Sequence, residues 1–141
     1  MLNLRFNTHM NLFHCLQKSS PQIRYNQENL KKTVKVFTDI VEDIEALEII
    51  EREAVSRLKA SLRLFDGSIL WVREVWIKGV MEDYSYYWLR PDETVIIGWD
   101  NAPHHDSVST FPHHKHVGDR IEESEERKME EILNFIKQFL E

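Results

Sequence analysis

Hydrophobic residues recur at every third or fourth position in the segment that follows Asn26. The stripe consists of Leu30, Val34, Phe37, Val41, Ile44 and Leu47, and it is widened by Ile40 and Ile50. This spacing places apolar side chains on one face of a helix, and Asn26 is a favourable residue for capping the first turn. The pattern therefore predicts an amphipathic helix over residues 26–54. The preceding residues, 1–25, follow no clear period, and we expect them to form an arm of uncertain structure.

The hydrophobic pattern changes to strict alternation after residue 57. Polar and apolar positions alternate through Arg57, Leu58, Lys59, Ala60, Ser61, Leu62, Arg63 and Leu64. Such alternation is typical of a strand with one buried face, and Asp66-Gly67 then favours a tight hairpin turn. Three further segments are rich in β-branched and aromatic residues and are predicted strands, at 68–78, 84–90 and 95–100. Because short turns join consecutive strands, neighbours must run antiparallel, and we predict a β-meander over 57–100.

A long segment without a clear period follows the predicted meander and precedes a second amphipathic pattern. Residues 101–119 contain two prolines and five of the seven histidines, so we expect a histidine-rich loop. Apolar residues then recur at helical spacing over 124–140, where Ser124 can cap the first turn. These elements predict one α+β domain over 26–141. Its antiparallel meander of at least four strands is expected to carry the N-terminal and C-terminal helices packed on the sheet.

Composition and charge narrow the classes of function. The chain has 141 residues, which suits one compact domain, and its formal net charge is −6. Segment 57–118 is nearly neutral, with seven Lys/Arg and eight acidic residues, so a small phosphate-binding site is compatible with it. The chain has a single cysteine, Cys15, and no apolar run of about eighteen residues. We therefore expect no disulfide, no membrane contact and a cytoplasmic location.

Two short blocks gather most of the side chains that can carry chemistry. The candidate catalytic residues in these blocks are Asp100, His104, His105, His113, His114 and His116. Because an imidazole titrates near neutral pH, a pair of histidines can act as base and acid in RNA cleavage without a metal. We expect at least two of these histidine rings to lie within reach of one small ligand, near Asp100, which orients an imidazole in this interpretation.

Two other interpretations of the histidine blocks stay open. The histidines can supply nitrogen ligands to a metal ion, either from His113, His114 and His116 or from His104 and His105. They can also satisfy backbone groups of the loop without any chemical role. The spacing matches no standard zinc signature and cysteine ligands are absent from the blocks, so the metal-free site is favoured and no cofactor is expected.

Aromatic and basic residues of the predicted sheet form a second feature. The four tryptophans and three of the four tyrosines fall within the later strands, so alternation must place some of them opposite the core. There they can stack on bases, although a half-buried sheet also favours aromatic residues for packing. Arg57, Lys59 and Arg63 share one strand face and can contact phosphates, while exposed strands are often basic without any ligand.

Four blocks of sequence carry a resemblance to a known family. They are Leu64-Phe65-Asp66-Gly67-Ser68, Tyr84-Ser85-Tyr86-Tyr87-Trp88, Trp99-Asp100-Asn101-Ala102-Pro103-His104-His105 and Thr110-Phe111-Pro112-His113-His114-Lys115-His116-Val117. Over residues 57–140 the chain resembles the TumE-type toxin family of prokaryotic toxin–antitoxin systems. Residues 1–56 lie largely outside this resemblance. The resemblance implies a toxin that is encoded beside a helix-turn-helix antitoxin and has a ribonuclease-like activity.

The resemblance also implies roles for particular positions and partners. Its distinctive positions are Asp100, Asn101 and the five histidines named above, with Tyr87 and Arg90 on the preceding strand. We expect Tyr87, Arg90, Asn101 and Lys115 to bind the RNA substrate. The leading hypothesis is an endoribonuclease toxin that uses the histidine-rich loop for acid/base chemistry, and a homodimer is considered. The alternatives are a non-enzymatic module that binds protein or nucleic acid and a histidine-ligated, metal-dependent hydrolase.

Overall fold

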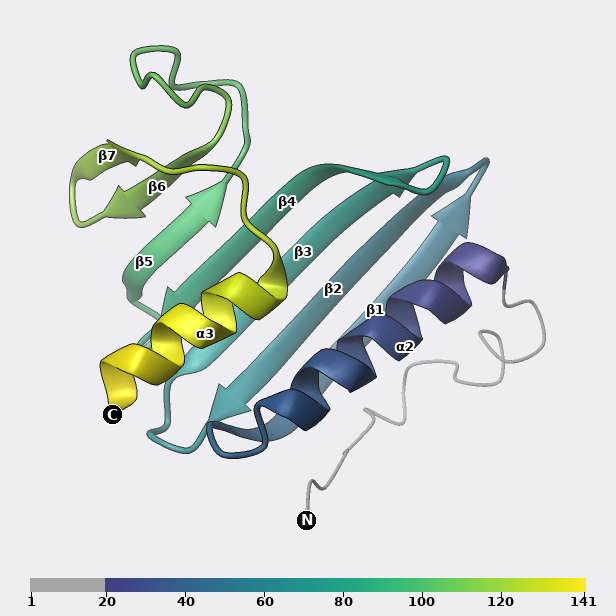
Figure 1. Ribbon diagram of the computed structural model, residues 1–141, viewed down its shortest axis with the longest axis horizontal. Helices are drawn as coiled ribbons and strands as arrows, with labels where there is room; N and C mark the ends of the chain where they lie inside the picture. Colours follow the sequence, from purple (N-terminus) through teal and green to yellow (C-terminus); the bar gives the residue numbers. More distant parts are fainter. Residues whose placement is uncertain (1–19) are drawn as a thin grey trace.

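The computed structural model describes residues 20–141, which form one seven-stranded sheet and two helices (Figure 1). The strands are β1 (Val41–Arg52), β2 (Val55–Leu64), β3 (Ile69–Ile77), β4 (Val80–Leu89), β5 (Val95–Asp100), β6 (His114–Val117) and β7 (Arg120–Glu123). They follow one another in this order across the sheet, and every neighbouring pair is antiparallel. The predicted α+β class and antiparallel meander are therefore confirmed. Residues 1–19 of the predicted arm lie outside the described residues.

Both helices lie on the same face of the sheet, α2 over β1 and β2 and α3 toward β4 and β5 (Figure 1). Helix α2 (Pro21–Val36) begins after Ser20, whose Oγ accepts a hydrogen bond from the backbone N–H of Ile23 at 3.1 Å. Pro21 suits the first turn because no helical hydrogen bond needs its missing N–H. Helix α3 (Met129–Leu140) buries an apolar stripe that includes Ile132, Leu133 and Ile136.

No helix among residues 20–141 is both long enough and apolar enough to span a membrane.

The predicted helix over 26–54 is wrong in its second half. Helix α2 ends at Val36, and the residues after the next turn form strand β1, which pairs with β2. Register shifts interrupt the pairing of β1 between Val41 and Asp43 and again between Ile44 and Ala46. Each irregularity lengthens the normal two-residue spacing of a strand, so buried residues of β1 recur three apart and imitate the spacing of a helix.

Three other predicted boundaries are corrected as well. Asn26 does not cap α2 but lies inside it, where its buried amide donates a hydrogen bond to a serine of β2 at 3.2 Å. The predicted loop over 101–119 contains strand β6, because these residues complete a ladder with β5. Helix α3 begins at Met129 rather than at Ser124, whose backbone N–H is instead held by Thr110 Oγ1 at 3.0 Å.

The hydrophobic core lies between the sheet and the two helices. Buried residues of the sheet on this side include Leu58, Leu62, Leu70, Val72, Tyr84, Tyr86 and Trp88. Neither described helix covers the opposite side of the sheet, which we call the open face (Figure 1). Alternation along the strands places on it Arg57, Lys59, Trp71, Arg73, Tyr87 and Asp100.

Candidate functional site

Strands β5 and β6 bring an aspartate and two histidines together on the open face. Asp100 is the last residue of β5 and pairs in register with His114, while Gly98 pairs with His116. Because side chains alternate along a strand, His114 and His116 share the open face and Lys115 points to the other side.

These three side chains make short polar contacts. His114 Nε2 lies 3.0 Å from Asp100 Oδ1, and His116 Nε2 lies 3.0 Å from Asp100 Oδ2. The two Nε2 atoms are themselves 3.1 Å apart. His105 joins them from the segment after β5, since its ring centroid lies 4.8 Å from that of His114 and 5.6 Å from that of His116. We call Asp100, His105, His114 and His116 the histidine centre.

The four residues of the histidine centre differ in their exposure. His114 is 1% exposed and Asp100 is 5% exposed, whereas His105 and His116 are partly exposed. The His114 ring is fixed from behind, because its Nδ1 lies 2.9 Å from the carbonyl oxygen of Pro112. A molecule that approaches from the open face therefore reaches His105 and His116 before it can reach His114.

Two further donors hold the carboxylate of Asp100. The backbone N–H of Ala102 donates to Oδ1 at 3.0 Å, and the Tyr87 hydroxyl donates to Oδ2 at 2.8 Å. Burial by itself raises the pKa of Asp100, but these hydrogen bonds and the neighbouring imidazoles outweigh it, so the pKa is lowered. Burial and the adjacent carboxylate together raise the pKa of Tyr87. An ionised carboxylate therefore lies beside a neutral phenol.

Gly98 allows the Tyr87 side chain to reach Asp100. A Cβ atom at position 98 would lie 2.4 Å from Cε1 of Tyr87, well inside the normal distance between two carbon atoms. The tyrosine ring therefore crosses β5 at a position where only glycine leaves room. The Tyr87 ring centroid also lies 6.3 Å from that of Trp71, edge to face, and 6.0 Å from that of His116. A row of aromatic rings thus leads across the open face to the histidine centre.

Two of the five predicted catalytic histidines lie outside the histidine centre. His104 is exposed in a turn after β5. His113 stacks on Tyr84, and its Nδ1 lies 2.9 Å from the Tyr84 hydroxyl. Tyr84 is buried on the helix-facing side of the sheet, and burial raises its pKa to about 12. The structure therefore brings three of the histidines together with Asp100 and separates His104 and His113 from them.

Two of the predicted substrate-binding residues lie near the histidine centre but differ in what they contact. Tyr87 is bonded to Asp100, as described above. Asn101 instead ties the end of β5 to β4, because its Oδ1 accepts a hydrogen bond from the Tyr84 backbone N–H and its Nδ2 donates to the Glu82 carbonyl, both at 3.0 Å. The hydrogen bonds of Asn101 therefore hold the C-terminal end of β5 against β4.

The other two predicted substrate-binding residues lie away from the histidine centre. Lys115 points to the opposite side of the sheet, where its Nζ lies 3.6 Å from a carboxylate oxygen of Glu122. Arg90 lies in the turn between β4 and β5, where its guanidinium donates to the carbonyl of Val95, the first residue of β5, at 3.2 Å. Asp100 is the last residue of that strand, so the length of β5 separates it from Arg90.

Sequence reasoning missed three features that shape the histidine centre. Assigning the whole segment 101–119 to a loop hid the alternation of His114, Lys115 and His116, which in a strand puts both histidines on one face. The carbonyl of Pro112 was also missed, and no side-chain pattern signals a backbone acceptor. Gly98 carried a usable signal, because a glycine inside a strand often marks a close approach.

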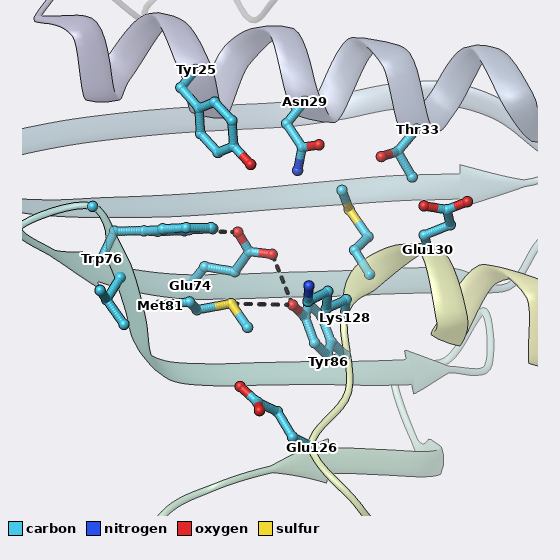
Figure 2. Close-up of a pocket in the computed structure, with 13 residues that line it drawn as sticks. Tyr25, Asn29, Thr33, Glu74, Trp76, Met81, Tyr86, Glu126, Lys128 and Glu130 are labelled. Atoms are coloured by element: carbon cyan, nitrogen blue, oxygen red, sulfur yellow. Dashed lines mark hydrogen bonds between the residues drawn. The ribbon is translucent and has the colours of Figure 1, made fainter.

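A separate cavity of about 530 Å³ opens between α2, the sheet and the start of α3 (Figure 2). Its buried carboxylate, Glu74, accepts a hydrogen bond from the Tyr86 hydroxyl at 2.8 Å and from Trp76 Nε1 at 3.0 Å. Burial raises the pKa of Glu74 in spite of both hydrogen bonds. The cavity lies on the helix-facing side of the sheet, opposite the histidine centre. The cavity and the histidine centre are therefore separate features on opposite sides of the sheet.

Comparison with known proteins identifies the family. A family model described as Toxin TumE matches residues 21–141. The comparisons found no matching curated protein and no matching solved structure. The family match includes α2 and β1, so residues 21–56 belong to the family pattern, in contrast to the narrower motif resemblance. Because the match covers nearly the whole chain, this protein belongs to the TumE toxin family and is the toxin of a toxin–antitoxin system, with an antitoxin as its partner.

Proposed function

We propose that this toxin is an endoribonuclease that acts on RNA at the histidine centre and is held inactive by a helix-turn-helix antitoxin. The observation that carries this proposal is the position of the centre beside the basic and aromatic residues of the open face. Exposed cations attract phosphates, and aromatic rings offer stacking surfaces for bases. Among the described residues, Arg57 and Lys59 form no ion pair, which leaves their charges available to RNA.

The strand register supports a continuous path for RNA across the open face. Lys59 pairs with Arg73, Arg73 with Ser85, and Ser85 with Asp100. A parallel row runs through Trp71 and Tyr87 to the position of His116. Neighbouring strands are about 4.8 Å apart, so Lys59 lies about 14 Å from Asp100 across three strand spacings. RNA bound along these rows places one phosphodiester at the histidine centre.

Cleavage of that phosphodiester needs three functions at the centre. A base takes the proton of the 2′-hydroxyl, an acid protonates the leaving 5′-oxygen, and positive charge stabilises the phosphate. His105 and His116 are the partly exposed imidazoles, so they are suited to proton transfer in a metal-free reaction. Asp100 and Tyr87 hold the His116 side of the site in place.

Growth and RNA measurements test this proposal directly. Induced expression of the wild-type chain should stop growth and generate cleaved RNA. His105→Ala and His116→Ala should each relieve the arrest, because loss of one proton-transfer group lowers a rate by about 10²–10⁴-fold. His104→Ala is the matched control, since His104 belongs to the same segment but lies outside the centre, and it should stay toxic. The cleaved RNA should carry 2′,3′-cyclic phosphates at its new 3′ ends and hydroxyl groups at its new 5′ ends if the reaction uses proton transfer alone.

Other outcomes of this experiment decide against the proposal. Full toxicity of a folded His105→Ala, His116→Ala double variant would remove the histidine centre from the mechanism. Toxicity without RNA cleavage would instead favour a non-enzymatic binding module. Circular dichroism of each variant must show the wild-type spectrum, so that loss of toxicity is not loss of folding.

A further inference from the structure

The three short contacts of the histidine centre cannot all be hydrogen bonds at the same time. A carbonyl oxygen can only accept a hydrogen bond, so the contact at 2.9 Å to Pro112 requires the proton of His114 to be on Nδ1. In the neutral ring Nε2 then carries a lone pair. That lone pair faces Asp100 Oδ1 at 3.0 Å, where two acceptors repel each other.

Changing the protonation of the rings only moves this conflict to another contact. If His114 carries a second proton on Nε2, it can donate to Asp100. His116 Nε2, 3.1 Å away, then either carries a proton that faces the His114 proton or has a lone pair that faces Asp100 Oδ2 at 3.0 Å. With the Asp100 carboxylate ionised, every arrangement of the ring protons leaves one of the three contacts joining two donors or two acceptors. Such a conflict is costly in a site where His114 and Asp100 are almost fully buried.

We propose that Asp100, His105, His114 and His116 bind a divalent transition-metal ion of the zinc type. A cation resolves all three contacts at once, because each Nε2 and each carboxylate oxygen then presents a lone pair to positive charge. Ligand atoms about 2.0–2.1 Å from one ion lie about 2.8–3.4 Å apart when they are neighbours in octahedral or tetrahedral arrangements. The separations of 3.0, 3.0 and 3.1 Å among Asp100, His114 and His116 are of this size.

His105 supplies the remaining nitrogen ligand. The candidate ligand atoms of His105, His114 and His116 all lie within 4.8 Å of one another. Two nitrogens on one ion are at most about 4.2 Å apart, and the His114 and His116 nitrogens already satisfy this limit. Any adjustment on binding therefore falls to His105, which is partly exposed on the segment after β5.

The surroundings of these residues match what a bound metal ion requires. A metal-binding histidine usually donates its other N–H to a carbonyl or carboxylate, and His114 does so to Pro112. A ligating carboxylate is usually held by further donors, and Asp100 is held by Ala102 N–H and the Tyr87 hydroxyl. Three imidazoles and one carboxylate form a donor set that suits zinc and other divalent transition metals.

Metal binding goes beyond the proposed function, because it can be measured without RNA. Metal binding also bears on how RNA would be cleaved, since a bound ion can polarise the phosphate. It would favour the alternative of a metal-dependent hydrolase over proton transfer by free histidines. Failure of metal binding leaves the RNA proposal intact with metal-free chemistry. Failure of RNA cleavage leaves a metal site whose role lies elsewhere.

Zinc titration of the full-length chain tests the proposal. The chain is made without a histidine tag by cell-free synthesis, stripped with a chelator, and titrated with Zn²⁺ in a calorimeter. We expect one ion per chain, and Co²⁺ in place of Zn²⁺ should give visible absorption bands. His105→Ala should weaken zinc binding at least about tenfold. His104→Ala, the matched control, should bind zinc as the wild type does.

Two results would overturn the metal proposal. The first is a folded wild-type chain that takes up no stoichiometric zinc. The second is equal affinity of the His105→Ala and His104→Ala variants. If stripping unfolds the chain and one equivalent of zinc restores its circular dichroism spectrum, the proposal is supported, because metal binding is then coupled to folding. His116→Ala gives an independent test of a second partly exposed ligand.

Discussion

Two buried carboxylates, Asp100 and Glu74, have pKa values that move in opposite directions. Burial raises the pKa of both, because water no longer stabilises the charged form. At Asp100 the contacts from Ala102, Tyr87 and the imidazoles outweigh burial. At Glu74 the two hydrogen bonds from neutral side chains do not. The neighbours of a carboxylate therefore decide its charge, and burial alone does not.

Replacing Glu74 with glutamine should change the pH dependence of stability. Because its folded pKa is raised above the ordinary value of 4.5, Glu74 favours folding below that value, and this contribution is lost as the pH rises through the folded pKa. Glutamine cannot ionise and can still bond to Tyr86 and Trp76. Glu74→Gln should therefore flatten this part of the profile and make the protein relatively more stable at high pH.

The test compares the free energies of unfolding of the wild type and of Glu74→Gln, each measured by denaturant titration over a range of pH. Glu82→Gln is the control, because it removes a glutamate that is exposed on the surface. A Glu74→Gln profile that runs parallel to that of the wild type at every pH would show that the buried carboxylate is not a source of pH dependence.

At the residue scale, the density of histidines drew attention to residues 101–119, and the structure brings only some of these histidines together beside Asp100. His114 and His116 share a face because they alternate with Lys115 in β6, but the segment was predicted as a loop, so this grouping was not foreseen. Whether His105 or His104 joins them depends on the path of the segment after β5, which no local pattern encodes. The pairing of His113 with Tyr84 depends on contact across the sheet and is equally invisible in the sequence.

The elements of the fold differ in how clearly their patterns can be read. Strand β2 alternates without interruption, so its residues could be assigned directly from the sequence. Strand β1 carries two irregularities and therefore shows helical spacing, while β6 has four residues and is too short to show any period. Both β1 and β6 are strands because they pair with neighbouring strands in the folded protein. Their local sequence patterns do not indicate this.

Within β5, a methyl group at position 98 should disturb the histidine centre through Tyr87. The added Cβ in Gly98→Ala would overlap the tyrosine ring, which must move away from Asp100. Overpacking of this kind costs about 1–3 kcal/mol of stability, and the ribonuclease activity that we propose should fall as well. Thermal or denaturant unfolding of purified Gly98→Ala measures the first effect.

A double-mutant cycle shows whether the tyrosine ring transmits the effect of Gly98→Ala. In a Tyr87→Ala background the ring is absent, so Gly98→Ala should cost much less than it does in the wild type. Equal costs in the two backgrounds would mean that the alanine acts on the β5 backbone itself.

At the scale of the whole molecule, the two sides of the sheet differ in burial and in charge. One side is buried under α2 and α3 and holds the core, together with the cavity around Glu74. The open face keeps Arg57 and Lys59 exposed although the chain as a whole has a net charge of −6. Local charge on this face, and not the total charge, governs its attraction for a polyanion.

Charge removal from the open face should weaken the RNA binding that we propose and should reduce its dependence on salt. The double variant Arg57→Gln, Lys59→Gln should bind a single-stranded RNA oligonucleotide less tightly, with a salt slope smaller by about 0.7 for each lost phosphate contact. Lys32→Gln on α2 removes an exposed lysine from the other side of the molecule and should have no comparable effect. Fluorescence anisotropy at several salt concentrations measures both. Equal slopes for all three proteins would exclude the open face as the RNA path.

The uninterrupted order of the strands has a consequence for how the chain folds during synthesis. Each strand pairs with the one made just before it, so every pairing is between neighbours in the sequence and the sheet can grow one strand at a time. The part of the proposed RNA path that lies over β2 to β4 is complete before β6 is made. A ribosome-bound chain can therefore present the binding surface while it still lacks His114 and His116. The reactive centre is assembled among the last elements of the protein, just before α3 closes the core.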